Sequence, residues 1–260
     1  MFGIIGIHLA ALLAFWPAMF TWKALLTALA LQAVCGMGIT IGFHRLLTHR
    51  SFRCSKGLEY ILTLLGCLNL QGGPIKWTAT HRLHHQHSDD EQDPHSPRHG
   101  FFWSHVLWCF TYDPSFDDYD QYSRYAKDLA RDRGQVFFER TTVYWQFVLA
   151  AALYLWGGWP CVIWGIFVRL VYVYHATWFV NSASHTWGYR TYETSDVSRN
   201  LWWVALLSFG EGWHNNHHAF PRSARHGLQR WEVDVSWLVI RALSAVGLVR
   251  DVHLPDNARA

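Results

Sequence analysis

The chain has 260 residues, of which 51% are hydrophobic and 17% aromatic, and its formal net charge is +3. A charge this small leaves no basic footprint for a nucleic-acid partner, and the length predicts a single domain over residues 1–260. The charge is unevenly spread. Residues 1–43 and 141–184 contain none of the 19 acidic residues and only two of the 22 basic ones, Lys23 and Arg169. This alternation is typical of membrane spans separated by water-facing segments.

Four apolar runs are long enough to cross a bilayer, which takes about 20 residues. We predict spans at residues 2–22, 24–43, 143–159 and 161–180. The short links between the first two and the last two make each pair a helical hairpin. Residues 44–141 and 181–260 then lie on one side of the membrane. Basic residues directly after the second span mark that side as cytosolic: Arg45, Arg50, Arg53 and Lys56.

Between and after the hairpins the sequence predicts a helical cap. Residues 58–70 and 201–209 are apolar but too short to span, which predicts buried or interfacial helices. Residues 77–87 are expected on a helix, and the polar, proline-containing stretch 88–100 in a loop. The fold class is therefore an all-α membrane protein with two hairpins and a cytosolic helical cap.

Histidines form three clusters in the cap. Two clusters share the spacing i, i+3, i+4, which places three rings on one face of a helix: His81, His84 and His85, then His214, His217 and His218. The third, His44 and His49, has spacing i, i+5, so both rings reach one centre only if the helix ends or bulges between them. His185 ends the fourth span on the same side, and we expect it to be a ninth ligand.

Eight or nine imidazoles exceed what one metal ion binds, so the clusters predict two. The five cysteines are scattered without a CxxC pair, which argues against structural zinc. A histidine-rich, thiolate-free pair suits iron that keeps positions open for oxygen. Apolar spans above the site point to a lipid chain as substrate. Asp89, Asp93 and Glu211 are candidates to orient the rings.

The clusters HRLLTH, HRLHH and HNNHH, together with WFVNSASH and GEGWHNNHHAFP, resemble the membrane-bound fatty acid desaturases, specifically the Δ9 branch. The resemblance covers roughly residues 30–248. It implies a cytosolic cap holding a non-haem di-iron centre that uses O2. By position it implies that Asn181 reaches one iron through a water molecule and that Trp77 and Trp178 line the acyl tunnel. The implied ligands are His44, His49, His81, His84, His85, His185, His214, His217 and His218.

Two departures from the acyl-CoA desaturases concern the substrate. Ala79 and Thr80 stand where those enzymes carry an Arg-Asp pair that holds CoA, and Tyr112 and Asp113 align with a second, basic pair. Losing these groups should weaken CoA binding, so we expect an acyl chain esterified in a glycerolipid, with acyl-CoA as the alternative. Cytochrome b5 haem and cysteine-ligated iron–sulfur motifs are absent from the 260 residues, so a separate carrier, ferredoxin or cytochrome b5, is expected to supply electrons.

The expected activity is O2-dependent insertion of a cis double bond, at Δ9, by a multi-pass protein of a bacterial inner membrane. One alternative is hydroxylation of a lipid, alkane or sterol at a similar di-iron site. Another is a non-catalytic metal transporter, whose ligands should lie within the spans. Only His8 and His175 lie inside apolar runs.

Overall fold

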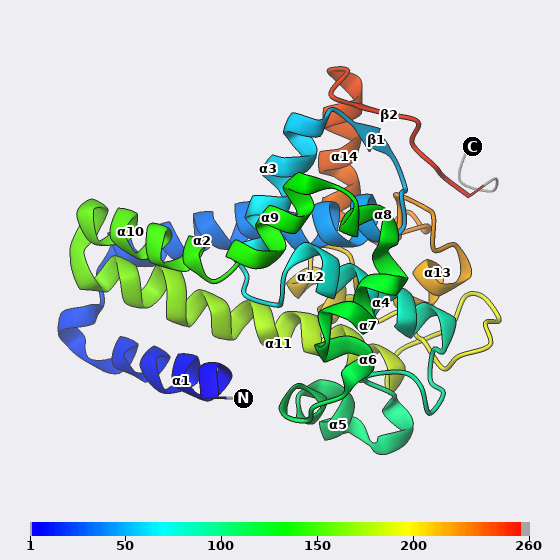
Figure 1. Cartoon of the computed structure of the whole chain (residues 1–260), viewed down its shortest axis with the longest axis horizontal. Coiled ribbons are helices and arrows are strands. Elements are labelled where there is room, and N and C mark those ends of the chain that lie inside the picture. The colour runs from blue at the N-terminus through cyan, green and yellow to red at the C-terminus, as the bar shows by residue number, and fades with distance from the viewer. Residues whose placement is uncertain (1, 256–260) are drawn as a thin grey trace.

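The computed structural model describes residues 2–255 (Figure 1) and is predominantly helical, as predicted. Four long helical segments run side by side along the long axis, and the shorter elements gather at one end. The long segments contain α1 Phe2–Ala11, α2 Trp22–Met37, α10 Tyr144–Val162 and α11 Arg169–Ser182. The shorter helices are α3 Lys56–Cys67, α4 Pro74–Gln86, α5 Phe101–His105, α6 Pro114–Asp117, α7 Tyr119–Tyr122, α8 Lys127–Ala130, α9 Arg133–Thr141, α12 Trp202–Leu207, α13 His214–Ala219 and α14 Val235–Ala245.

The first predicted span, residues 2–22, is wrong as a single helix. Helix α1 ends at Ala11 and passes through two 3₁₀ turns, Leu12–Phe15 and Pro17–Met19. Trp16 between them has an extended backbone, with ψ of 123°. Proline disfavours the helical conformation of the residue before it, so Pro17 explains the break. The chain then reverses into α2, whose first turn is capped by the Thr21 hydroxyl.

The second predicted span does not end at Phe43. Helix α2 continues directly into a π-helix, Gly38–Thr48, whose backbone hydrogen bonds join residues five positions apart. The amide of His49 donates to the carbonyl oxygen of His44 over 3.1 Å. A π-helix has more residues per turn than an α-helix, so positions i and i+5 fall on one face. This is the bulge that the spacing of His44 and His49 required.

The second hairpin has its turn where the sequence predicts it. Gly157 and Gly158 leave the helical conformation, and Gly158 has a φ of 67°, which favours glycine. The chain returns through a π-helical stretch, Ile163–Val168, into α11. The buried Arg169 guanidinium donates to Asn69 Oδ1 and to the Leu68 carbonyl at the end of α3, which joins the hairpin to the cap.

Two helical stretches are long and apolar enough to cross a membrane: residues 22–48 and the folded-back 144–185. The stretch over residues 3–15 is apolar but shorter. Large apolar side chains on the outer faces of both hairpins are more than half exposed, among them Leu9, Phe15, Leu26, Phe147 and Leu155. An apolar surface this extensive is typical of a protein that contacts lipid.

The cap packs against the π-helix. Its core combines Ile41, Phe43 and Phe52 with buried residues of α3, α4 and α14. Two short strands that the sequence did not predict, β1 Arg53–Cys54 and β2 Val249–Arg250, pair antiparallel with Arg53 opposite Arg250. They fasten the C-terminal segment beside the end of the first hairpin. The remaining 3₁₀ turns are Pro97–His99, Leu107–Phe110, Ser123–Ala126 and Ala183–His185.

Candidate metal centre

Five imidazoles converge on one point at the junction of the π-helix, α4 and α13. Their nearest ring nitrogens all lie within 4.8 Å of one another. The Nε2 atom of His217 lies 3.1 Å from that of His44 and 2.9 Å from that of His85. The Nε2 atom of His81 lies 3.2 Å from that of His49 and 3.1 Å from that of His85. We call these rings the five-histidine group: His44, His49, His81, His85 and His217.

Four further imidazoles form a second group beside the first. The Nε2 atom of His214 lies 3.0 Å from that of His185, and the Nε2 atom of His84 lies 3.4 Å from that of His218. We call these four rings the four-histidine group. The structure therefore brings together all nine histidines that the sequence singled out, although they come from four separate segments.

The two HxxHH motifs divide in the same way. Their i and i+4 rings stay together, His81 with His85 and His214 with His218. Their i+3 rings, His84 and His217, each join the other group. On a helix surface, the residues at i+3 and i+4 are both neighbours of residue i, but they lie on opposite sides of it. Each motif thus serves both groups and holds them side by side.

Carboxylates hold the outer nitrogen of four rings. The three that the sequence proposed lie in place: Glu211 contacts His44 Nδ1, Asp93 lies 2.9 Å from His84 Nδ1, and Asp89 lies 2.9 Å from His185 Nδ1. The sequence missed the fourth, Asp196, whose carboxylate lies 2.6 Å from His218 Nδ1. It sits in a loop with no recurrent spacing, so no pattern in the sequence distinguished it from the other acids.

A buried ionic network behind His44 was also missed. Arg45, fully buried, donates to Glu211 Oε1 over 2.6 Å and to both carboxylate oxygens of Asp234 over 3.1 Å. It also donates to His226 Nδ1 over 3.0 Å. An arginine lies next to a cluster histidine in the sequence, which could have indicated this partner. The network fixes Glu211 and thereby the ring of His44.

Burial favours the neutral form of most of the nine rings. Burial, and then the neighbouring imidazoles, hold the pKa of His81, His85, His214 and His217 well below its ordinary value. Burial also lowers the pKa of His218 to about 4, although Asp196 acts in the opposite direction. Neutral imidazole is the form that binds a metal ion.

The ring protons of His84 and His218 indicate whether this site fits metal ions. A carboxylate only accepts, so in a neutral His84 or His218 ring the single proton sits on Nδ1. The two Nε2 lone pairs then face each other at 3.4 Å with no proton between them. Burial opposes protonation of His84, but the charge of Asp93 and the hydrogen bond to it raise the pKa of this ring. The site thus attracts positive charge, which a metal ion would supply.

The spacing of the nitrogens agrees with shared coordination. Imidazole nitrogens bind a zinc ion at about 2.0–2.1 Å, so two ligand nitrogens at a right angle about one ion are about 3 Å apart. The five-histidine group has neighbouring Nε2 atoms 2.9–3.2 Å apart. Five ligands exceed a tetrahedral zinc site. The five-histidine group therefore fits a metal ion with more ligands than tetrahedral zinc, and the four-histidine group offers four ligands for another.

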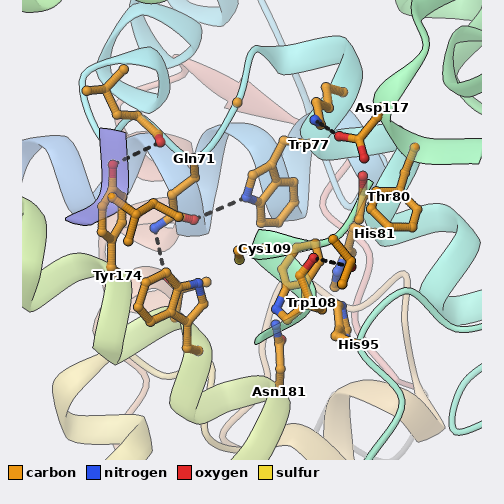
Figure 2. A pocket seen from close by; sticks show the side chains of 18 residues that line it. Gln71, Trp77, Thr80, His81, His95, Trp108, Cys109, Asp117, Tyr174 and Asn181 are labelled. Atoms are coloured by element: carbon orange, nitrogen blue, oxygen red, sulfur yellow. Dashed lines mark hydrogen bonds and ion pairs between the residues drawn. The ribbon is translucent and has the colours of Figure 1, made fainter. Parts of the chain in front are cut away.

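A cavity of about 220 Å³ opens beside His81 of the five-histidine group (Figure 2). The predicted tunnel residues Trp77 and Trp178 both line it, as does the predicted water-mediated ligand Asn181. The Gln71 side chain accepts from Trp77 Nε1 over 3.2 Å and donates to Thr177 over 2.9 Å. These bonds fix the indole of Trp77 against the cavity.

A second, mostly apolar cavity of about 60 Å³ shares Trp77, His81 and Asn181 with the first. It extends between α2 and α11, where Gly36 and Val180 line it, and it reaches His44 and His214. The two cavities thus share lining residues beside rings of both histidine groups. This is an arrangement that can hold a long apolar chain across a reactive centre.

Of the four positions that depart from the acyl-CoA pattern, one lines the first cavity. Thr80 lines the cavity, and Ala79 is buried in the protein core. Tyr112 is 70% exposed, and Asp113 is an exposed cap of α6. Lys76 also lines the cavity but is paired with Asp117 over 2.6 Å.

Comparison with known proteins agrees with the site. The family model described as "Fatty acid desaturase" matches residues 14–241. The chain belongs to the fatty acid desaturase family. It is 52% identical to the sn-1 stearoyl-lipid 9-desaturase of Anabaena variabilis, over 97% of this chain and 92% of that protein. It is 49% identical to the sn-2 palmitoyl-lipid 9-desaturase of Nostoc sp. (strain 36), over 96% of this chain and 87% of the other.

Relatives of this desaturase include one with a different substrate. This chain is 45% identical to the acyl-CoA C20 Delta5-desaturase of Anemone leveillei, over 97% of this chain and 80% of that protein. The chain is accordingly an oxidoreductase that desaturates fatty acyl chains, as its sequence predicted.

Proposed function

We propose that this desaturase binds two iron ions through its nine clustered histidines and inserts a cis double bond, at Δ9, into the acyl chain of a glycerolipid. The observation that carries the proposal is the convergence of the nine Nε2 atoms in two groups, beside the meeting point of two cavities. The hydroxylase and the transporter remain without a specific observation in their favour.

The five-histidine group would hold one iron and the four-histidine group the other, with Asn181 reaching the second through a water molecule. When bound, iron supplies the oxidising power toward O2 that side chains lack. The protein holds the rings in position, because the carboxylates of Asp89, Asp93, Asp196 and Glu211 retain the Nδ1 protons and turn Nε2 inward. Burial of the rings excludes water from the reacting carbons.

Trp77 and Trp178 would position the acyl chain. The indole of Trp77 lines both cavities and is fixed by Gln71, so a chain passing from one cavity to the other must lie against it and beside His81. Holding one pair of methylenes at the centre limits reaction to one place along the chain. The names of the relatives from Anabaena and Nostoc specify desaturation at position 9, which supports Δ9 here.

Three features support a lipid-bound acyl group over acyl-CoA. The chain is more similar to those acyl-lipid enzymes than to the acyl-CoA enzyme from Anemone. Ala79, Thr80, Tyr112 and Asp113 stand where acyl-CoA desaturases carry charged headgroup contacts. Lys76, the one lysine or arginine lining the first cavity within residues 2–255, is already paired with Asp117.

We further propose that the four long segments of the hairpins lie in a bacterial inner membrane as a multi-pass anchor, with the cap on the cytosolic side. The apolar outer faces of α1, α2 and α10 and the basic residues that follow Phe43 support this placement. It brings the cavities close to the acyl chains of the inner leaflet.

Expression in a host that lacks its own desaturase tests the function. Fatty acid methyl esters are measured separately in the phospholipid and acyl-CoA pools, with His217→Ala as the inactive control. We expect Δ9 monoenes to arise first in the phospholipid pool. Hydroxy acids without monoenes would favour the hydroxylase, and monoenes that arise first in the acyl-CoA pool would reject the lipid-bound substrate.

A further inference from the structure

The nine rings present two different faces to their surroundings. The two acyl cavities touch His44, His81 and His214. An open groove of about 660 Å³ touches a separate set, His49, His85 and His218. These three rings are partly exposed, whereas five of the other six are buried. The groove also meets both groups, since His49 and His85 belong to the five-histidine group and His218 to the other.

The reaction needs such a second face. Removing two hydrogen atoms from an acyl chain yields two electrons, but reducing O2 to two water molecules takes four. Two electrons and two protons must therefore come from elsewhere: –CH2–CH2– + O2 + 2 e⁻ + 2 H⁺ gives –CH=CH– + 2 H2O. The five cysteines are free thiols, and the 260 residues carry no cytochrome b5 haem motif and no cysteine-ligated iron–sulfur motif. The electrons must enter through the surface.

We propose that this groove is the docking surface for a one-electron carrier protein with an acidic face, and that His49, His85 and His218 form the electron entry edge of the centre. The inference rests on the proposed iron chemistry. The groove is built from the end of α4, the loop before α12 and the end of α13. Helix α13 lies away from the turn between α10 and α11 (Figure 1), on the side that the topology assigns to the cytosol.

The charge of the partner follows from one edge of the groove. Arg222, exposed, lines it and also lines a neighbouring groove together with Arg50, Arg53 and Arg250. The side chains of Arg50 and Arg53 are 63% and 77% exposed. The groove itself has mixed charge, because Asp90, Glu193 and Asp196 also line it. Arg50 and Arg53 are paired with Asp128 and Asp251, whereas Arg222 and Arg250 form no ion pair within residues 2–255. Acidic groups of a partner would therefore be drawn to the arginine edge, and opposite charge across a rim mainly raises the association rate.

The test uses iron-loaded enzyme in phospholipid, with a reduced, acidic [2Fe–2S] ferredoxin as the carrier. Arg222→Glu reverses the edge, and Gln86→Trp narrows the groove at an exposed position. Arg241→Glu and Gln121→Trp are matched controls at exposed positions outside the residues that line the groove. Iron per chain is measured for every variant. A parallel assay reduces the enzyme with dithionite, removes the excess, admits O2 and counts monoenes from one turnover.

We expect Arg222→Glu to raise the half-saturating ferredoxin concentration about three- to tenfold and to weaken its dependence on salt, with Gln86→Trp raising it at least about tenfold. Both should retain wild-type iron and single-turnover yield, and the controls should match wild type. Unchanged ferredoxin dependence in both groove variants would overturn the proposal, as would an equal loss in the dithionite assay. A wild-type enzyme that gives no monoene with dithionite and O2 would instead refute the proposed function.

Discussion

At the scale of single residues, the tautomer of each ring decides whether it can bind a metal. Four carboxylates lie beside an Nδ1 atom and favour a proton on it, which leaves the Nε2 lone pair free to face the centre. Three of them, Asp89, Asp93 and Glu211, were predicted because they lie close to histidine clusters in the sequence. Asp196 reaches His218 across 22 residues of loop and helix, and only the fold brings them together.

Asp196→Asn tests this role. An amide can present its NH2 group to His218 Nδ1, which would favour the opposite tautomer. We expect iron in the four-histidine group to bind about 10–100 times more weakly, measured as iron retained against increasing chelator concentration. Asp90→Asn, at an exposed neighbouring position, is the control. Equal retention by Asp196→Asn and wild type would contradict the assignment.

A second prediction at this scale concerns pH. The pKa of His81, His85, His214 and His217 is lowered by burial, so these rings stay neutral in the folded protein but bind protons once unfolded, near pH 6.5. The unfolded state then binds more protons, and the free energy of unfolding falls as pH drops. We expect the unfolding midpoint of iron-free protein to decrease from pH 7 to pH 5. A midpoint that rises toward pH 5 would show that the rings are protonated when folded.

At the scale of elements, the π-helix is what lets the first hairpin contribute two ligands. The spacing of His44 and His49 predicted a helix end or bulge but not which, because a π-helix has no propensity signature comparable to proline or glycine breaks. The backbone bond from His49 to His44 resolves the question. The Trp16-Pro17 pair carried a readable break signal, yet the apolar run on either side suggested one continuous span.

Close packing holds the π-helix in place, which leads to a third prediction. A Cβ atom on Gly38 would lie 2.2 Å from the backbone nitrogen of Gly66 in α3, and backbone cannot move aside cheaply. We expect Gly38→Ala to destabilise the protein by about 1–3 kcal/mol and to lower iron content. Gly57→Ala in α3, where the nearest atom is 4.0 Å away, should be neutral or stabilising. Equal unfolding midpoints for the two variants would show that the contact does not matter.

At the scale of the whole molecule, two hairpins carry one cap, and the acyl cavities and the carrier groove lie on different faces of the same centre. The sequence predicted the second hairpin turn, the helices that carry the clusters and the meeting of nine histidines, because charge pattern and histidine spacing are local signals. It could not assign rings to metals, since the division of each HxxHH motif depends on how α4 and α13 face each other.

The membrane arrangement makes a fourth prediction. A reporter that works only in the cytosol, inserted in the loop at residues 90–92 or fused after residue 260, should be active in both places. Insertion at the Gly157–Gly158 turn should inactivate the reporter, because that turn is proposed to face the opposite side. Activity at the turn with none at residues 90–92 would invert the topology.

The most direct test of the two-metal centre is the amount of iron per purified chain, measured by inductively coupled plasma mass spectrometry. We predict two irons in the wild-type protein and one in the double variant His185→Ala, His214→Ala, which disables the four-histidine group and leaves the five-histidine group intact. A wild-type chain that holds one iron or none after iron loading, or a double variant that keeps two, would contradict the account.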